Sequence, residues 1–589
     1  MTELAKQPKR YLNINSAIRK YVVEAGRDLH FFGDESQEHT AERVQEFSDT
    51  IRGGIPDARI TWALSWGALT DTSERYRRIR EKVKEMHRVY NDEVTFLVGG
   101  FFPIMYNTSD EINKDIHDAL KLIEEMMDGY RPKSLICGYL SAPCIEYARE
   151  HEGIIAVQGT IWSQYGVDLG DGDGGMPYPF YPSKQHYLKP AQGKADFIDC
   201  FNLDCYTVDS ICARNETDRG VDYNSRTGVG GIETYNILGL GTGMQQAMHS
   251  TRVHFDENIK HNPYGWVVNT VELSQFGRGK PFYREWPKWI KETWDDVQCL
   301  TQTELAEALR KEFPDNSALS YCFKQSGSGI VGPIKGGSVR SEEVAWIMNQ
   351  SFRLGILKKE GNQHFVYDYT DYRQEYREPT FIPNPVNPLT NRGWSLMGEI
   401  NQKRSRTQDK PVPFEDFTHW EDVYSTLTQR ERTFLDEFVA KPMEITINDS
   451  DCGDGIHQVA YDGNWMEVRS GVIFEDDERI HERHHFFTYN YDMHTSAKPG
   501  ATYTLRFVGS QIKLFTTLSD DFGIFGLSID GGEEVLVDLY SPVLAEQALV
   551  YTSPVLTGGE HTLKVRVTGE RNPKSDGFTV AADRFDVIQ

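Results

Sequence analysis

Short apolar runs alternate with helix-like segments from about residue 10 to residue 285. The runs at 60–66, 94–100, 134–138 and 154–158 are apolar on consecutive positions, which predicts strands buried on both faces. A helix between the first two runs is predicted from apolar residues spaced three and four apart: Tyr76, Ile79, Val83, Met86 and Tyr90. Repeated strand–helix units indicate an α/β fold, and we expect a TIM-like (β/α) barrel of seven or eight strands.

The helix expected after the second strand has a recognisable start and end. Thr108 to Glu111 have the pattern of a capping box, and Gly129 is placed to end the helix. No GxGxxG turn follows any of these strands, which favours a barrel over a nucleotide-binding sheet.

Residues 286–440 differ from the segment before them. Stretches rich in tryptophan and charge at 285–312 and 341–357 predict helices, and a Pro-rich stretch at 382–388 predicts a connecting loop. We therefore expect a barrel over residues 1–285, followed by a helical accessory region over 286–440.

From residue 441 the pattern changes to short strands separated by Gly and Asp turns. The clearest strands lie at 503–508, 512–515 and 561–567. This pattern predicts a β-sandwich over residues 441–589. Three segments resemble the small jelly-roll modules appended to carbohydrate-active enzymes: 528–532, 537–541 and 559–565. The resemblance implies a module like those that bind carbohydrate.

Two apolar runs end directly on a carboxylate. Residues 197–204 end at Asp204, and residues 266–272 end at Glu272. Because α/β barrels carry their active sites at the carboxyl ends of their strands, we predict that both acids line one site. Glu233, which follows two glycines, is a third catalytic candidate. For each acid, a salt bridge or a capping role is the alternative.

Cleavage of a glycosidic bond uses such a pair of acids. One carboxylic acid protonates the leaving oxygen, and a second carboxylate stabilises the oxocarbenium-like centre or activates water. The sequence does not assign these two roles between Asp204 and Glu272.

The loop after residues 154–158 is rich in aromatic and polar residues. Trp162, Gln164, Tyr165 and Asp173 are its candidates for substrate binding. Aromatic rings stack on the C–H surface of a sugar while polar groups bind its hydroxyls. The alternative is a Gly-rich surface loop whose rings cover the rim of the barrel.

Three further residues are predicted to reach the same rim. Asp34 and Glu35 lie in a loop near the start of the chain, and Trp66 ends the run at 60–66. We include them among the substrate-binding candidates.

Length, charge and cysteine pattern narrow the class of protein. A chain of 589 residues predicts two or three domains, and a formal net charge of −25 argues against nucleic acid and anionic membranes as partners. The start of the chain has no secretory signal, and no run is long enough to span a membrane. The 8 cysteines form no CxxC pair, so we expect a cytoplasmic protein. We expect no cofactor, and a homo-oligomer stays open.

The segment from Ser109 to Tyr139 resembles the barrel shared by polysaccharide deacetylases and related glycosidases. Those enzymes hold a metal ion with a paired-Asp motif on the first strand and an HxxxH pair, and neither motif occurs in the predicted barrel. The HExxH pattern at 481–485 runs into a strand-like segment, which argues against a zinc protease. We therefore predict no metal site.

Taken whole, residues 10–440 resemble an uncharacterised bacterial family with an α/β barrel of glycoside-hydrolase type. Four segments carry the resemblance: 60–66, 161–165, 181–184 and 224–230. The resulting hypothesis is a glycoside hydrolase with a carbohydrate substrate. The alternatives are a metal-dependent polysaccharide deacetylase and a non-catalytic carbohydrate-binding protein.

Overall fold

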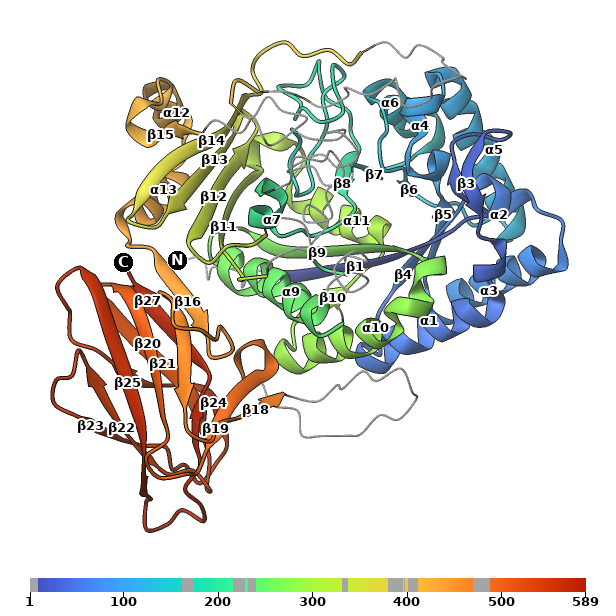
Figure 1. The fold of residues 1–589 in the computed structure, drawn as a ribbon. Coiled ribbons are helices and arrows are strands. Elements are labelled where there is room, and N and C mark those ends of the chain that lie inside the picture. The colour runs from blue at the N-terminus through green and yellow to red at the C-terminus, as the bar shows by residue number, and fades with distance from the viewer. Residues whose placement is uncertain are drawn as a thin grey trace, which may run out of the picture. The chain divides into compact units, whose positions relative to one another are not determined.

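The computed structural model describes residues 9–160, 174–215, 228–230, 240–330, 337–379, 396, 398–400, 411–469 and 488–589. The chain forms two compact units (Figure 1). The first comprises Met1–Val339, Val344–Leu357 and His364–Phe438. The second comprises Arg340–Glu343, Lys358–Gln363 and Val439–Gln589.

Strand β1 (Lys9–Ile18) is the centre of the first sheet. It pairs in parallel with β9 (Tyr264–Glu272), β4 (Ile60–Leu64) and β10 (Val297–Cys299). Strand β5 (Glu93–Phe96) pairs in parallel with β4. Every residue of β4 and β5 is buried, as the consecutive apolar pattern predicts.

A smaller sheet consists of three parallel strands: β6 (Ser134–Ile136), β7 (Ala156–Thr160) and β8 (Phe201–Asp204). A bridge between Leu97 and Ile136 joins it to the first sheet beyond β5. A bridge between Tyr206 and Asn269 joins the end of β8 to β9. The pairings therefore return to β9, and we call β1, β4, β5, β6, β7, β8 and β9 the strand ring.

Helices follow the ring strands and cover their outer faces (Figure 1). They are α1 (Ala41–Gly54), α2 (Trp66–Thr70), α3 (Glu74–Tyr90), α4 (Pro103–Tyr106), α5 (Ser109–Met126), α6 (Ala142–Glu152), α9 (Leu240–Arg252) and α10 (Leu273–Thr293). The short helix α7 (Ser210–Arg214) follows β8 and instead contacts the segment 320–326. The predicted face of α3 is confirmed, because Tyr76, Ile79, Val83 and Met86 are buried. The capping box at Thr108 is also confirmed.

The start of α11 (Gln302–Glu312) is hydrogen-bonded to β1, β4 and β5, toward the amino ends of these strands. The carbonyl of Leu300 accepts a hydrogen bond from Asn13 Nδ2 at 2.7 Å. The backbone N–H of Gln302 donates to Thr61 Oγ1 at 3.2 Å, and that of Thr303 donates to Glu93 Oε2 at 3.1 Å. These bonds leave the carboxyl ends of the strands as the edge where loops carry function.

A second β-sheet follows the ring in the first unit. Its order is β11 (Ser320–Ser326), β12 (Glu342–Asn349), β13 (Phe352–Lys359), β14 (Gln363–Asp371) and β15 (Val412–Pro413). Helices α12 (Trp420–Thr426) and α13 (Gln429–Ala440) come after it.

The expectation of helix over residues 341–357 was wrong, because this segment forms β12 and β13. All of β12 is buried, so its apolar residues are consecutive instead of alternating. A short run that is apolar throughout is compatible with a buried helix or a buried strand, and its pattern does not separate the two.

A buried ion pair fastens the second sheet to the segment beside the ring. Arg353 on β13 donates to Asp368 on β14 from Nε at 2.9 Å and from Nη2 at 2.5 Å. Its Nη1 donates to the carbonyl of Gly175 at 2.9 Å, and Tyr372 Oη donates to the carbonyl of Gly174 at 2.7 Å. The sheet therefore fixes the chain where it leaves the predicted substrate loop.

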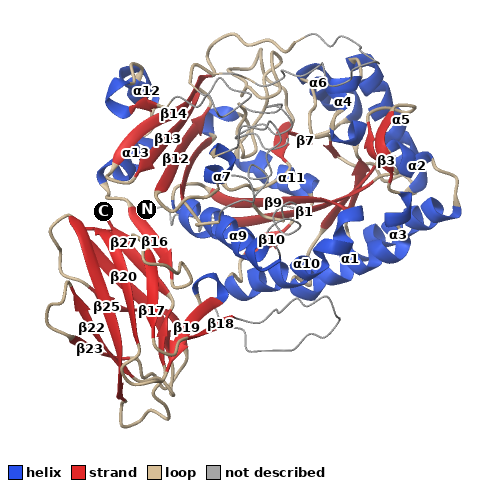
Figure 2. Ribbon diagram, in the orientation of Figure 1, coloured by secondary structure: helices blue, strands red, loops and turns tan. Residues whose placement is uncertain are grey.

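The second unit consists of antiparallel strands joined by loops (Figure 2). Its three sheets have the orders β16-β27-β21-β24, β17-β20-β25-β22-β23 and β18-β19-β26. The strands are β16 (Glu444–Asn448), β17 (Gln458–Asp462), β18 (Met466–Arg469), β19 (Asp492–Ser496), β20 (Thr502–Gly509), β21 (Gln511–Leu518), β22 (Ile524–Ile529), β23 (Val535–Asp538), β24 (Ala545–Thr552), β25 (Gly559–Glu570), β26 (Val580–Ala582) and β27 (Arg584–Ile588). Alternate residues of β20 and β25 enter one apolar core.

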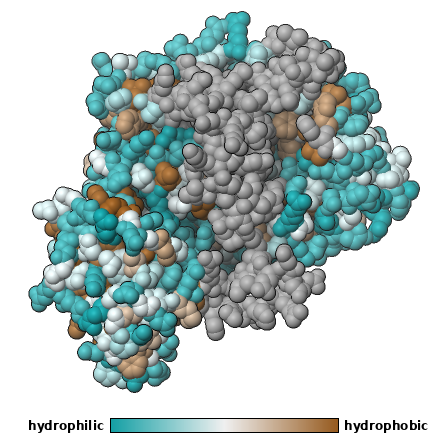
Figure 3. Space-filling model, in the orientation of Figure 1, coloured by the Kyte–Doolittle hydropathy of each residue, from teal (hydrophilic) through white to brown (hydrophobic). Residues whose placement is uncertain are grey.

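The described residues visible in Figure 3 are mostly hydrophilic, with small apolar patches between polar areas. This surface agrees with the formal net charge of −25. Among the helices that the structure describes, none is long and apolar enough to cross a membrane.

Removal of one partner from the buried pair in the second sheet should destabilise the first unit. We expect Asp368→Ala to lower the free energy of unfolding by about 3–5 kcal/mol, because Arg353 would stay buried without its carboxylate. Urea unfolding followed by tryptophan fluorescence measures the change. The control is Asp422→Ala, whose pair with Arg373 is largely exposed and should contribute less than about 1 kcal/mol. Equal losses in the two variants would contradict the assignment.

Candidate functional site

Asp204 and Glu272 are the last residues of two ring strands, β8 and β9. The bridge between Tyr206 and Asn269 brings the chain after β8 beside β9. The backbone N–H of Thr207 also donates to the carbonyl of Val268 at 3.0 Å. Both predicted catalytic acids therefore lie at the carboxyl-terminal edge of the ring, on neighbouring segments.

A hydrogen-bonded ladder crosses the interior of the ring beneath these acids. Asn15 Nδ2 donates to Thr270 Oγ1 at 3.1 Å, and Thr270 Oγ1 donates to Gln158 Oε1 at 2.9 Å. Gln158 Nε2 donates to the carbonyl of Asp204 at 3.1 Å. The ladder joins β1, β9, β7 and β8, so it fixes the backbone that carries Asp204.

The same ladder shows which way Glu272 faces. Thr270 points into the ring, because its side chain bonds to Gln158 on β7. Side chains alternate along a strand, so Glu272, two residues further, leaves β9 on the same face. Its register partner on β1 is Ala17.

Arg19, directly after β1, joins two of the predicted acids. Its guanidinium donates from Nε to Glu35 Oε2 at 2.6 Å and from Nη2 to Glu35 Oε1 at 3.2 Å. Its Nη1 lies 3.6 Å from Glu272 Oε1. Arg19 is only 5% exposed, so a buried cation lies between two carboxylates at the edge of the ring.

Electrostatics keep this cluster charged. Burial lowers the pKa of Arg19, but the charge of Glu272 and the bond to Glu35 outweigh it and hold that pKa above its usual value. Burial alone would raise the pKa of Glu35, but His39 and Arg19 together lower it to about 2. Ser274 Oγ also donates to Glu35 Oε1 at 3.3 Å. Glu35 is therefore a carboxylate throughout the neutral range.

His39 is a member of the cluster that the sequence did not indicate. Its Nε2 lies 3.8 Å from Glu35 Oε2, which is beyond hydrogen-bond distance. Both ring nitrogens are buried and lack a hydrogen-bond partner among the described residues. Burial lowers the pKa of His39, although the nearby Glu35 carboxylate opposes this shift.

Asp204 and Glu272 both influence the pKa of the Cys205 thiol, which directly follows Asp204 in the chain. Burial raises the pKa of Cys205 well above its usual value, and the charges of Asp204 and Glu272 add to this effect. Asp204 is 1% exposed, and its Oδ1 accepts a hydrogen bond from the backbone N–H of Cys205 at 2.7 Å. The two acids thus share one electrostatic environment.

Two other candidates lie near the ring edge in different roles. Asp34 is exposed and accepts the backbone N–H of Ser36 at 2.7 Å, which is the contact of a turn. Trp66, at the start of α2, lies under the guanidinium of Arg27 at 4.0 Å. Their part in substrate binding stays a prediction.

Five candidates lie outside the described residues: Trp162, Gln164, Tyr165, Asp173 and Glu233. The segment before Glu233 is described only at residues 228–230. There the carbonyl of Val229 accepts Asn269 Nδ2 at 3.2 Å. Gly230 has a φ of +66°, and a Cβ at this position would lie 2.1 Å from Asn269 Nδ2. Only glycine fits this contact beside β9.

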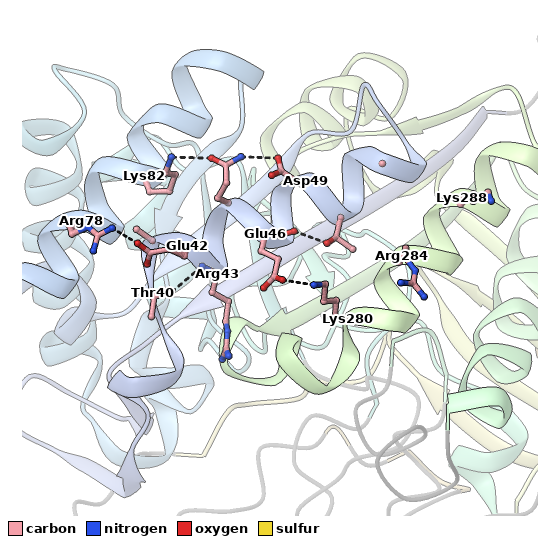
Figure 4. Close-up of a pocket in the computed structure, with 14 residues that line it drawn as sticks. Thr40, Glu42, Arg43, Glu46, Asp49, Arg78, Lys82, Lys280, Arg284 and Lys288 are labelled. Carbon is pink, nitrogen blue, oxygen red and sulfur yellow. Dashed lines mark hydrogen bonds and ion pairs between the residues drawn. The ribbon is translucent and has the colours of Figure 1, made fainter. Parts of the chain in front are cut away.

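A cavity of about 980 Å³ lies away from these acids, on helices α1, α3 and α10 (Figure 4). Its lining is charged, and Glu46 Oε1 pairs with Lys280 Nζ at 2.5 Å across it. Arg78 pairs with Glu42, and Thr40 Oγ1 accepts the N–H of Arg43 at 3.0 Å. These internal pairs describe a solvated helical surface, and none of the predicted site residues lines it.

The fold and the site define an α/β protein with an acidic site at the carboxyl ends of parallel strands. Residues 4–348 match DUF3863, described as a domain of unknown function with a solved structure, and residues 353–427 match DUF3864, described in the same way. The first match covers more than half of the 589 residues, so the chain belongs to the DUF3863 family.

Solved structures extend the comparison. A protein from Parabacteroides distasonis, described as a candidate glycoside hydrolase/deacetylase, is 36% identical with a TM-score of 0.64. The similarity covers 74% of this chain and 99% of that one. Two candidate polysaccharide deacetylases are more distant. The one from Mycobacterium smegmatis has 12% identity, coverage of 53% and 93%, and a TM-score of 0.29. The one from Pseudomonas aeruginosa is 13% identical, with a TM-score of 0.33. That similarity covers 52% of this chain and 93% of the other. No curated protein matches the chain.

The described residues do not fit a divalent metal ion at the ring edge. The first strand is β1, which ends on Ala17-Ile18, and the residue that follows it is the cation Arg19 and not a metal-binding acid. No group of three or more His, Cys, Asp or Glu side chains among the described residues is arranged to hold a metal. Asp71, the first acid in the sequence after β4, pairs with Lys20 Nζ at 2.7 Å.

Glu35 should stabilise the fold in a pH-dependent way. Its pKa is depressed in the folded chain, so its contribution is present above the unfolded value near 4.5 and is lost as the pH falls toward 2. We expect Glu35→Gln to lower the free energy of unfolding by about 3 kcal/mol at pH 7, and by progressively less between about pH 5 and pH 3. Urea unfolding across this range measures it.

The matched control is Glu38→Gln. The pair of Glu38 with Arg43 is more than half exposed at the carboxylate, so its loss should cost less than about 1 kcal/mol. A Glu35→Gln effect that does not change between pH 7 and pH 3 would contradict the pH dependence.

Proposed function

We propose that the chain is a hydrolase that acts on carbohydrate, with its active site at the carboxyl ends of β8 and β9. One observation carries the proposal: two neighbouring ring strands end on the carboxylates Asp204 and Glu272. Paired carboxylates at such an edge are the arrangement that hydrolysis of sugar linkages uses.

We extend the proposal to the fold type of each unit. We take the strand ring with its outer helices as a (β/α) barrel of the type found in glycoside hydrolases and polysaccharide deacetylases. We take the second unit as a jelly-roll module like those that bind carbohydrate. The name of the relative from P. distasonis and the closed path of strand pairing support this assignment.

Two hydrolytic reactions fit the site. The first is removal of an acyl group from a saccharide, where one carboxylate activates water and the other acid protonates the leaving alkoxide. The second is cleavage of a glycosidic bond, with one acid on the leaving oxygen and one carboxylate at the anomeric centre. The relative from P. distasonis carries both names, so each reaction has the same support from that protein.

The described residues do not supply the metal site that the deacetylase alternative was expected to need. In this proposal, Asp204 and Glu272 therefore perform the proton transfers, and no step passes through a metal. Trp162, Gln164, Tyr165, Asp173 and Glu233 stay candidates for the same pocket, with Asp34, Glu35 and Trp66 at its rim. A cytoplasmic location and a homo-oligomer also stay predictions.

The test is a panel of nitrophenyl glycosides and acetylated oligosaccharides, each with and without EDTA. We expect hydrolysis of one substrate class that EDTA does not abolish. Asp204→Asn and Glu272→Gln should each lower kcat by about 10²–10⁴-fold, because general acid or base catalysis is lost while the shape is kept. Release of nitrophenol or acetate measures the rate.

Asp199→Asn is the matched control. Asp199 lies before the amino end of β8 and pairs with Arg149 Nη2 at 2.6 Å and Arg310 Nη1 at 2.6 Å. This variant should lose stability but keep kcat. Full activity in both Asp204→Asn and Glu272→Gln would overturn the proposal. Sugar-dependent thermal stabilisation without product would favour the non-catalytic binding protein instead.

A further inference from the structure

We propose that Arg19 is a positioning residue that holds Glu272 as the ionised member of the catalytic pair. Glu272 then acts as the base or nucleophile, and Asp204 acts as the proton donor. This inference rests on the proposed function, which leaves the two roles unassigned.

The first support is the position of Arg19 relative to β9. Ala17 and Glu272 are register partners, and Arg19 lies two residues beyond Ala17. Because the Ala17 side chain is short, the space between the two strand ends is open to longer neighbouring side chains. As a result, the Arg19 guanidinium reaches Glu272 across the strand pair, with Nη1 at 3.6 Å from Oε1.

The second support is the way in which one guanidinium divides between two acids. Nε and Nη2 form a bidentate pair with Glu35, at 2.6 Å and 3.2 Å, which fixes the plane and direction of the group. The remaining Nη1 is the part directed at Glu272. Glu35 thus orients Arg19, and Arg19 presents a fixed positive charge to Glu272.

The third support is the different surroundings of the two glutamates. Glu35 comes from the loop after β3 (His30–Asp34), and Ser274 and His39 lie against it as well as Arg19. Glu272 leaves β9 on the face that points into the ring. Of the two glutamates, Glu272 is therefore the one placed to meet a substrate at the ring edge.

An opposite charge within about 4–6 Å favours the ionised form of a carboxylate. Arg19 has no competing access to bulk water, because it is 5% exposed, so its effect on Glu272 is weakly screened. A carboxylate held in this form suits proton acceptance or nucleophilic attack and not proton donation. The donor role then passes to Asp204, which is 1% exposed, since burial disfavours the charged form of a carboxyl group.

With these roles for Glu272 and Asp204, bonds and protons balance in both candidate reactions. In deacylation, Glu272 takes a proton from water, the hydroxide oxygen bonds to the acyl carbon, and the C–O bond to the sugar breaks as Asp204 protonates the leaving oxygen. In glycosidic cleavage, Asp204 protonates the leaving oxygen as that bond breaks. Glu272 either deprotonates the attacking water or bonds to the anomeric carbon until water displaces it. Where Glu272 acts as the base, the proton that it gains replaces the one that Asp204 lost. Where Glu272 acts as the nucleophile, Asp204 regains its proton from the water that displaces Glu272.

One experiment reads the state of Glu272 without any substrate. Glutamate labelled with ¹³C at the side-chain carboxyl is titrated by NMR, and the Glu272 signal is identified by its loss in Glu272→Gln. In Arg19→Met we expect the titration midpoint of that signal to rise by about one to two pH units. In Arg19→Lys the rise should be smaller, because a positive charge returns without the bidentate geometry.

The second reading is the pH profile of kcat/KM on the substrate that the panel identifies. The acidic limb of the profile should move upward in Arg19→Met by the same one to two pH units, and by less in Arg19→Lys. A purely structural role for Arg19 would lower stability and leave this limb in place. Urea unfolding at pH 7 shows whether each variant is folded.

The matched control is Arg52→Met. Arg52 is similarly buried and pairs with Asp92 Oδ1 at 2.5 Å, but it lies at the amino end of the ring strands. It should leave both the Glu272 signal and the acidic limb unchanged.

An NMR midpoint that does not move in Arg19→Met would overturn the inference, whether or not the chain is a hydrolase. A midpoint that moves without the acidic limb would overturn the role given to Glu272. If no substrate is found, the proposed function fails, but the NMR reading still shows whether Arg19 sets the charge of Glu272.

Discussion

The burial of one charged side chain, Arg19, is the constraint on which the arrangement of the site depends. A buried cation is destabilising by several kcal/mol unless carboxylates and hydrogen bonds compensate it. Glu35 and Glu272 provide this compensation from two segments far apart in the sequence. The loop after β3 and the end of β9 must therefore meet the end of β1, and the acid at the end of β9 is held where the ring opens.

The interior of the ring meets the same requirement with neutral groups. Asn15, Thr270 and Gln158 are buried, and each satisfies part of the hydrogen-bonding capacity of another. The bond from Thr270 to Gln158 connects β9 and β7, which are not adjacent in the pairing order. The last bond of the ladder reaches the backbone of Asp204, so a polar interior replaces close apolar packing at the level just below the acids. This polar interior gives the two acids a defined separation that loops alone would not give.

The sequence predicts much of the apolar part of this fold. Consecutive apolar residues locate β4 and β5, the spacing from Tyr76 to Met86 locates α3, and the runs that end on Asp204 and Glu272 locate the carboxyl ends of β8 and β9. The interpretation of residues 341–357 failed because a fully buried strand and a buried helix share one pattern. Strand β1 was not predicted, since Asn13 and Asn15 interrupt its apolar run, and these polar residues face the interior.

Arg19 and His39 could not be found from the pattern for a related reason. A single arginine after a polar strand has the appearance of a surface residue, and its burial depends on partners that are distant in the chain. The link between Arg19 and Glu272 arises from the register of β1 and β9, which local sequence does not encode. Since a guanidinium is covalently fixed and ionised across the physiological range, the positive charge it contributes cannot be removed by a chelator. The charge balance around Arg19 therefore changes with the protonation of the carboxylates that it contacts.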